Sequence, residues 1–246
     1  MAGAEEVKPY EHSTAEKKEQ VAEMFNNISK RYDLLNHVLS LNIDKGWRKK
    51  VVRMVSAEQP EKVLDVATGT ADLAIAISGK TTAHITGADI SSGMLEVGKK
   101  KVSAKGLDGR ITLELGDSEN LPYPENTFDV ITVAFGVRNF QNLQNGLKDM
   151  LRVLKPGGLL VVLEFSQPKA FPFKQAYHLY SHYILPGIGR LVSKDPRAYT
   201  YLPESVAAFP YGPAFEEELK TAGYHMPTTQ QVTFGIASIY NARKPK

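Results

Sequence analysis

The sequence predicts an α/β fold in which a parallel sheet is covered by helices on both faces. From Lys62 onward, short apolar segments alternate with helical patterns, and this alternation requires right-handed crossovers between parallel strands. The segment VLDVATGTADL (63–73) is an apolar run that holds an acid, Asp65, and then breaks in a turn around Gly69. A strand that turns into a helix in this way is typical of the first unit of a nucleotide-binding sheet.

The remaining elements follow from the same alternation of patterns. We expect strands near 62–67, 84–89, 110–115, 128–135 and 158–165, and helices near 71–78, 92–105 and 142–153. Before them, Ser13 and Glu16 form a capping-box pattern, and apolar residues then recur at helical spacing as far as Tyr32. A second helix is expected over about 45–56, and the tail near 224–243 predicts two strands.

We interpret the chain as a single domain, because 246 residues can bury one full core. Four segments make it up: an N-terminal helical extension (1–56), a cofactor-binding core (62–166), a substrate cap (171–215), and a C-terminal helix and strands (216–246). The cap is distinct in composition, since it holds ten of the twenty-one Phe and Tyr residues and six prolines.

Composition excludes several classes of protein. A net charge of +3 is too small to argue for nucleic acid as a partner, and the absence of cysteine excludes disulfides and thiolate metal sites. Glu5 and Glu6 stand where a signal peptide needs positive charge, and no apolar run approaches the roughly 20 residues of a membrane span. We expect a cytoplasmic protein, and peripheral contact with the inner face of the membrane stays open.

The turn after the first strand argues against two common kinds of cofactor. A dinucleotide-binding fold needs glycines in the pattern G-x-G-x-x-G, but Ala67, Gly69 and Asp72 occupy those positions. A phosphate-binding P-loop needs G-K-[ST] after the turn, and the sequence lacks it. The expected ligand is therefore neither a dinucleotide nor a nucleoside triphosphate.

Three acids lie at the carboxyl edge of the first three strands, where open α/β sheets bind ligands. Asp65 is in the first strand, Asp89 ends the second and suits both hydroxyls of a ribose, and Asp117 follows the third and suits an adenine amino group. Three acids fit a cationic ligand without phosphate, so we expect S-adenosylmethionine between Gly69 and Asp89. Taken singly, each acid could equally be a solvated carboxylate or a helix cap.

Two long motifs extend this cofactor prediction to a family. YDLLNHVLSLNIDKGW (32–47) and RVLKPGGLLVVLEFS (152–166) resemble the two signatures of the ubiquinone/menaquinone biosynthesis C-methyltransferases, and GDSENLPYPENTFDVITVAFGVRNF (116–140) is similar to that family as well. The resemblance runs from about Glu19 to nearly the end of the chain. It implies a class I S-adenosylmethionine-dependent methyltransferase fold, Rossmann-like, with seven strands and the last antiparallel. It also implies methylation of a ring carbon on a polyprenylated quinol.

By motif match, the resemblance implies that Thr70, Asp89, Asp117 and Ser118 contact the cofactor. The chain departs from the family pattern in two places. Ala71 stands where many members have glycine in the cofactor turn, which adds a methyl group. Ala134 stands where some have a serine, which removes a polar contact. Neither departure alters the expected activity.

Carbon methylation requires an electron-rich ring, which a hydroquinone supplies once one hydroxyl is ionised. A phenol pKa of roughly 10 makes that ionisation cost about 4 kcal/mol at pH 7. Arg138, just after the fourth strand, is the expected catalytic residue that stabilises the phenolate, and an ion pair with a nearby acid is the alternative. Asn139 is expected to orient a hydroxyl or to form a turn. His37 is expected to act as the base or to pack at a helix end.

The cap has two interpretations. Phe173, Tyr177 and Tyr180 recur at helical spacing, so the segment is either a groove for the prenyl tail or an ordinary cover over the sheet. A polyprenyl tail lives in the bilayer, which predicts transient contact with the membrane surface. No metal is expected, because His178 and His182 lie four apart on a helix but have no convincing third ligand.

We therefore expect a methyltransferase that converts a demethylmenaquinol to a menaquinol in menaquinone biosynthesis. C-methylation of a polyprenyl benzoquinol in ubiquinone biosynthesis is an alternative, as is a module that binds the cofactor without turnover. A nucleic-acid methyltransferase would need a basic face or an N-P-P-[YF] loop, and Asp72 disfavours a dehydrogenase. The oligomeric state stays open, a homo-oligomer included.

Overall fold

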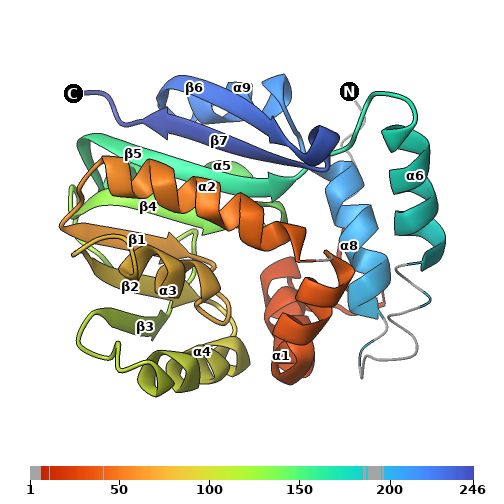
Figure 1. Cartoon of the computed structure of the whole chain (residues 1–246), viewed down its shortest axis with the longest axis horizontal. Coiled ribbons are helices and arrows are strands. Elements are labelled where there is room, and N and C mark those ends of the chain that lie inside the picture. The colour runs from red at the N-terminus through yellow and green to blue at the C-terminus, as the bar shows by residue number, and fades with distance from the viewer. Residues whose placement is uncertain (1–6, 11, 41, 185–186, 188–194, 196) are drawn as a thin grey trace.

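The computed structural model describes residues 7–10, 12–40, 42–184, 187, 195 and 197–246. One seven-stranded sheet runs through it in the order β3-β2-β1-β4-β5-β7-β6 (Figure 1). Its strands are β1 (Lys62–Val66), β2 (His84–Asp89), β3 (Ile111–Leu115), β4 (Phe128–Ala134), β5 (Leu154–Phe165), β6 (His225–Val232) and β7 (Ala237–Arg243). The first five strands are parallel, and β7 is antiparallel to both of its neighbours. The expected α/β fold, with seven strands and the last antiparallel, is confirmed.

Helices cover both faces of the sheet and bury a separate apolar core on each. The first face carries α2 (Ile43–Ala57), α3 (Asp72–Ser78) and α4 (Ser92–Ala104), and the second carries α5 (Leu143–Val153) and α9 (Pro213–Thr221). Successive strand residues alternate between the two cores. Val63 and Val161 are buried on the first face, whereas Leu64 and Val162 are buried on the second.

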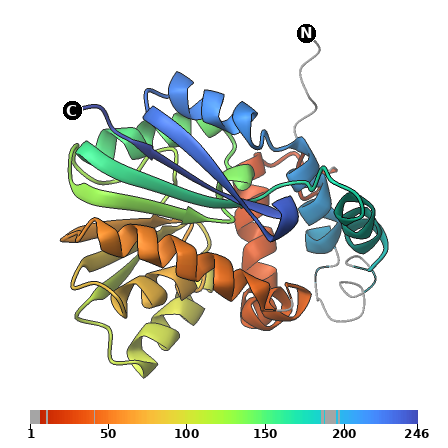
Figure 2. The same ribbon diagram turned by 45° about the horizontal axis from the view of Figure 1, so that its top comes forward.

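The N-terminal extension and the cap meet beyond the carboxyl ends of the parallel strands (Figures 1 and 2). The extension contributes α1 (Lys17–Leu39), and the cap contributes α6 (Phe173–Leu179), the short helix η2 (Tyr180–Ile184) and α8 (Arg197–Ala208). A third apolar core joins α1, α8 and the start of α4; its buried members are Val21, Met24, Ile28, Met94, Ala198, Tyr199 and Tyr201. Two segments far apart in sequence are thereby packed over the edge of the sheet where ligands bind in this fold.

Two element boundaries differ from the sequence-based expectation. The structure starts α1 at Lys17, because the Glu16 amide donates to the Glu19 carboxylate at 3.2 Å, and Ser13 instead accepts from the Ala15 amide in the preceding turn. The fifth strand starts at Leu154 rather than near 158, because Leu154 already pairs with Phe128 ahead of a bulge. The later cap of α1 and the bulge in β5 both depend on local hydrogen bonds, which apolar periodicity does not predict.

Candidate active site

A pocket lies at the carboxyl ends of β1, β2 and β4, where Gly69 and Asp89 face each other. Oδ2 of Asp89 accepts from the Gly69 amide at 2.7 Å, and Oδ1 accepts from the Ser91 amide at 2.8 Å. Burial raises the pKa of Asp89, and hydrogen bonds from the backbone of Ser91, Gly69 and Ile90 oppose that shift. Each carboxylate oxygen has a second acceptor position, so Asp89 is held rigidly and can still accept from the two hydroxyls of a ribose.

Asp117 and Ser118 line the same pocket at the end of β3. Oδ1 of Asp117 accepts from the Glu119 amide at 2.9 Å, and Oδ2 lies 3.4 Å from Nζ of Lys18 on α1. The charge of Asp117 raises the pKa of Lys18. Lys17 donates to the Phe140 carbonyl at 3.0 Å, so the first turn of α1 is fixed across the open side of the pocket.

The described lining of this pocket fits S-adenosylmethionine. Its lining contains three acids, Asp89, Asp117 and Glu119, and one cationic side chain, Lys18. This excess of negative charge suits a cationic ligand that lacks phosphate. Gly69 has φ +57, and a Cβ there would stand in open space, so glycine both permits the turn and leaves the backbone accessible. The pocket is referred to below as the cofactor pocket.

Asp65 and Thr70, also expected at the cofactor, do not line the cofactor pocket but line a small cavity beside it that shares Gly69. Asp65 is buried and accepts from the Thr68 and Thr132 hydroxyls, each at 2.6 Å; burial raises its pKa to about 6 against the effect of both hydrogen bonds. The Thr70 hydroxyl donates to Asp33 at 2.5 Å and accepts from Lys101 at 3.2 Å. Asp65 therefore fixes the end of β1, and Thr70 joins the turn to α1 and α4.

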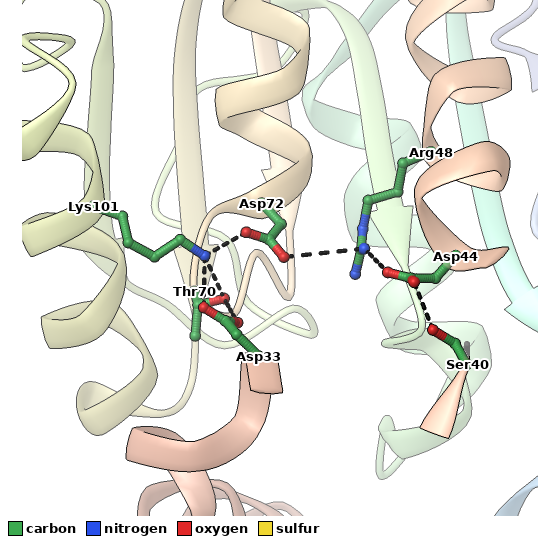
Figure 3. Close-up of polar contacts among 7 residues, drawn as sticks. All are labelled: Asp33, Ser40, Asp44, Arg48, Thr70, Asp72 and Lys101. Carbon is green, nitrogen blue, oxygen red and sulfur yellow. Dashed lines mark hydrogen bonds and ion pairs between the residues drawn. The ribbon is translucent and has the colours of Figure 1, made fainter. Parts of the chain in front are cut away.

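A polar network surrounds the glycine turn on the side of α1 and α2 (Figure 3). Lys101 bridges Asp33, at 2.8 Å, and Asp72, while Arg48 pairs with Asp44 and lies 4.0 Å from Asp72. The network thus connects the N-terminal extension to Thr70 and Asp72, which follow Gly69 in the turn.

A second cavity, here called the ring cavity, lies next to the cofactor pocket. The two share Phe25, Tyr32 and Phe135 in their walls. The ring cavity also has three charged lining residues, which are Asp44 and Arg48 on α2 and Arg138 in the 3-10 helix η1 (Val137–Asn139). Phe135 has φ +61, an unfavourable conformation for a bulky side chain, and such strain is typical of functional sites.

Arg138 is held by a buried ion pair. Its Nη1 donates to Oε1 of Glu164 at 2.8 Å and to the Phe135 carbonyl at 2.5 Å. The Arg138 side chain is 7% exposed and that of Glu164 is 0% exposed; burial raises the pKa of Glu164, and Arg138 opposes the shift. The ion pair that was the alternative for Arg138 is thus present. It occupies one nitrogen only, and Nε is buried with no hydrogen-bond partner among the described residues.

Asn139 has an unused buried acceptor beside Arg138. It lines the cofactor pocket, and its Nδ2 donates to the Phe135 carbonyl at 3.5 Å. Its Oδ1 is buried without a hydrogen-bond partner in the described part of the chain. A buried donor and a buried acceptor on adjacent residues are costly unless a ligand satisfies them. His37, the other expected catalytic residue, is on α1, but its side chain is outside the part that the structure describes.

A third cavity, of about 260 Å³, extends from the ring cavity into the cap and is called here the apolar cavity. It shares Phe165 and Leu202 with the ring cavity, and its other described lining residues are Ser40, Ile43, Trp47, Phe173, Ala176, Tyr177, Tyr180, Ser181, Pro203, Val206 and Ile236. Trp47, Phe135 and Phe165 form an aromatic cluster at the junction, with ring centroids 4.6 to 6.3 Å apart. Cofactor pocket, ring cavity and apolar cavity therefore adjoin in that order.

Three residues of the site were not identified from the sequence. Glu164 is the only acid within the apolar run GLLVVLEF, and that position was the available signal. Asp44 and Arg48 belong to an ordinary helical pattern of charges, where solvent exposure is the usual outcome. Their burial depends on the packing of α2 beside the cap, which the sequence pattern does not reveal.

Comparisons with known proteins place the chain in one family. The family model of the ubiE/COQ5 methyltransferases matches residues 13–244. A demethylmenaquinone methyltransferase from Bacteroides fragilis is 44% identical over 241 residues, which cover 98% of each chain. A protein from Geotalea daltonii named ubiquinone/menaquinone biosynthesis C-methyltransferase UbiE is 45% identical over 231 residues, covering 93% of this chain and 98% of its own.

Solved structures show the same fold at low sequence identity. A SAM-dependent methyltransferase from Aquifex aeolicus has a TM-score of 0.55 at 20% identity and covers 74% of this chain and 81% of its own. The [4+2]-cyclase SpnF has a TM-score of 0.62 at 19% identity and covers 93% of this chain and 97% of its own. One fold therefore serves a methyltransferase and a cyclase, so activity has to be argued from the site.

Proposed function

The chain belongs to the ubiE/COQ5 methyltransferase family, and we propose that it methylates a ring carbon of a demethylmenaquinol to give a menaquinol. It is a methyltransferase that uses S-adenosylmethionine, whose sulfonium centre supplies the methyl group when bound. The observation that carries the proposal is the order of the three adjoining cavities. The polar cofactor pocket matches S-adenosylmethionine. The ring cavity, with its aromatic walls and buried arginine, matches the ring of a prenylated quinol, and the apolar cavity matches its tail.

Arg138 and Asn139 supply the polar contacts that a quinol hydroxyl needs. In the proposed arrangement, Nε of Arg138 donates to the oxygen that becomes a phenolate, and Oδ1 of Asn139 accepts from the hydroxyl or from a water next to it. Arg138 stays protonated, so it stabilises the anion without acting as the base. The aromatic cluster of Trp47, Phe135 and Phe165 excludes water, which strengthens that electrostatic contact.

The apolar cavity receives the first part of the prenyl tail in this proposal. Tyr177 lines this cavity; burial raises its pKa to about 12, and the charge of Arg138 opposes that shift. Phe173 lines the cavity and stacks on Phe234 with centroids 3.7 Å apart. Phe234 is 66% exposed and Phe171 is 81% exposed, so the cavity borders an aromatic surface.

We propose that this aromatic surface contacts the membrane while the substrate is exchanged. The proposed contact is peripheral. None of the described helices has the length and the apolar composition of a membrane span. Phe171 and Phe234 are large apolar side chains of the kind that bury in the headgroup region, and Lys169 and Lys174 flank Phe171 in sequence. A polyprenyl tail can then pass from bilayer to cavity without crossing water.

A labelled methyl-transfer assay tests the activity. The enzyme is given S-adenosylmethionine labelled in the methyl group, together with a demethylnaphthoquinol or a benzoquinol that carries the same prenyl tail. We expect label on the naphthoquinol ring carbon, in keeping with the relative from Bacteroides fragilis. Faster transfer to the benzoquinol would replace the proposed substrate, and cofactor binding without transfer to either quinol would reduce the chain to a binding module.

A further inference from the structure

The ring cavity has two arginine–carboxylate pairs, of which the proposed function uses one. Arg138 pairs with Glu164, and Arg48 pairs with Asp44 on α2. The guanidinium of Arg138 lies 5.5 Å from the centre of the Phe165 ring, and that of Arg48 lies 5.8 Å from the centre of the Phe135 ring. Those two rings are 4.6 Å apart, so both cations flank the same aromatic surface.

The second pair differs from the first in which partner faces the cavity. Glu164 is fully buried, and only Arg138 lines the ring cavity, so the first pair presents a donor. Asp44 and Arg48 both line the cavity, so the second pair also presents a carboxylate. An ionised carboxylate only accepts hydrogen bonds, whereas a guanidinium only donates.

Asp44 is fixed in position by its neighbours (Figure 3). Oδ1 accepts from the Ser40 hydroxyl at 2.6 Å, and Oδ2 accepts from Nη1 of Arg48. The same Nη1 lies 4.0 Å from Oδ2 of Asp72, beyond hydrogen-bond distance. A positive neighbour favours the ionised form of a carboxylate. Asp44 is thus a preorganised acceptor at the end of the ring cavity that lies on α2.

A quinol carries two hydroxyls at opposite ends of its ring, whereas a quinone carries two carbonyls. One hydroxyl faces Arg138 in the proposed function, so the opposite one lies at the far end of the ring. A hydroxyl can donate to Asp44, but a carbonyl oxygen there would face a carboxylate oxygen, and two acceptors cannot form a hydrogen bond. Sites built to bond one substrate group discriminate strongly against an analogue that lacks it.

We propose that Asp44, held by Arg48 and Ser40, selects the reduced quinol over the quinone by accepting a hydrogen bond from the hydroxyl opposite Arg138. This inference rests on the proposed function. It gives the enzyme a means to avoid occupation by the quinone, which has the same tail and cannot be methylated because its ring is electron-poor.

Binding of the two redox forms tests the proposal on Asp44→Asn. A short-tailed demethylmenaquinone is titrated by anaerobic calorimetry into the enzyme in the presence of S-adenosylhomocysteine. One titration uses the oxidised quinone, and a second uses the same compound after reduction to the quinol. We expect the wild type to bind the quinol about 10- to 100-fold more tightly, the scale of a hydrogen bond to a charged acceptor. An asparagine amide can donate to a carbonyl, so Asp44→Asn should weaken quinol binding and strengthen quinone binding.

The matched control is Asp72→Asn, which removes the other carboxylate near Arg48 but changes no group that lines the ring cavity. Its ratio of quinone to quinol dissociation constants should equal that of the wild type. A second variant, Ser40→Ala, keeps the carboxylate of Asp44 and loses one contact that orients it, so its ratio should fall by a few-fold. It supplies the test if Asp44→Asn does not fold.

Three results would overturn the inference. These are equal affinity of the wild type for the two redox forms, losses by the same factor for both forms in Asp44→Asn, and a ratio that changes as much in Asp72→Asn as in Asp44→Asn. Each can occur in an enzyme that still methylates the quinol, so each is distinct from failure of the proposed function. Absence of methyl transfer to any quinol would instead reject the function itself.

Discussion

Arg138→Ala should lower stability and catalysis through two separable effects. The substitution removes the ion pair with Glu164 and leaves a fully buried carboxylate without its cation. Breaking a buried pair in this way costs about 3–5 kcal/mol. For a domain of this length, that loss corresponds to a melting temperature lower by roughly 6–20 °C. Removing a preorganised donor to the phenolate should lower kcat by about 10²–10³, or about 2.7–4 kcal/mol.

The two effects have opposite dependence on pH. Burial already raises the pKa of Glu164, and loss of Arg138 raises it further. A carboxyl whose folded pKa lies above its unfolded value stabilises the fold below the unfolded pKa and loses that stabilisation as pH rises through the folded one. The variant should therefore be least stable at high pH. Its activity should rise with pH, because more quinol is then ionised without assistance.

The double variant Arg138→Ala/Glu164→Gln separates the two effects. It contains no unpaired buried charge, so most of the melting temperature should return, while kcat stays low because the donor is still missing. Arg138→Lys should recover only part of the rate, since an ammonium keeps the charge without the planar geometry. Differential scanning calorimetry and pH–rate profiles on the three variants provide the data. If kcat returned with stability in the double variant, Arg138 would hold the loop rather than assist catalysis.

Three further variants test other parts of the site. Asp89→Ala should weaken S-adenosylmethionine binding by about 1.5–3 kcal/mol in calorimetry, because a charged acceptor is lost; unchanged affinity in a folded variant would remove Asp89 from the cofactor pocket. Asp65→Asn should gain about 2 kcal/mol of stability relative to the wild type between pH 4 and pH 7. The folded pKa of about 6 lies above the ordinary value of 3.8, so the wild type loses stability as pH rises across that window. Denaturant unfolding at both pH values measures this gain, and a difference that does not vary with pH would contradict it. Phe171→Ser with Phe234→Ser should lower binding to anionic vesicles and raise KM for long-tailed quinols more than for short-tailed ones; equal effects on both tails would leave the surface without a role in docking.

Much of the fold followed from local patterns in the sequence. The strand at 84–89 and the helix at 142–153 match their observed bounds to within a residue, because apolar periodicity and the Asn142 cap act locally. The cap was predicted only from its aromatic content. Its helix α8 packs against α1, a contact between segments more than 150 residues apart that no local pattern encodes.

The candidate site also has residues that local sequence patterns predict and residues whose positions depend on tertiary packing. Asp89, Asp117 and Arg138 follow strand ends, and strand ends converge at one edge of a parallel sheet, so their shared location could be expected. Thr70 was assigned by motif, yet its hydroxyl bonds to Asp33 and Lys101, partners supplied by other helices. Asp44 and Arg48 reach the ring cavity only because α2 packs beside the cap. Tertiary packing determines the position of these two side chains, and the spacing of charges in the sequence does not predict it.

The most direct test of the account is a crystal structure of the enzyme with S-adenosylhomocysteine and a short-tailed demethylmenaquinol, grown without oxygen. We predict the ring between Phe135 and Arg138, with one hydroxyl at Nε of Arg138 and the tail directed between α6 and α8. The unsubstituted ring carbon should face the sulfur, at a separation that leaves the carbon and a bound methyl group roughly 3–3.5 Å apart. A ring bound outside the ring cavity, or one with both hydroxyls away from Arg138 and Asn139, would contradict the proposed mechanism.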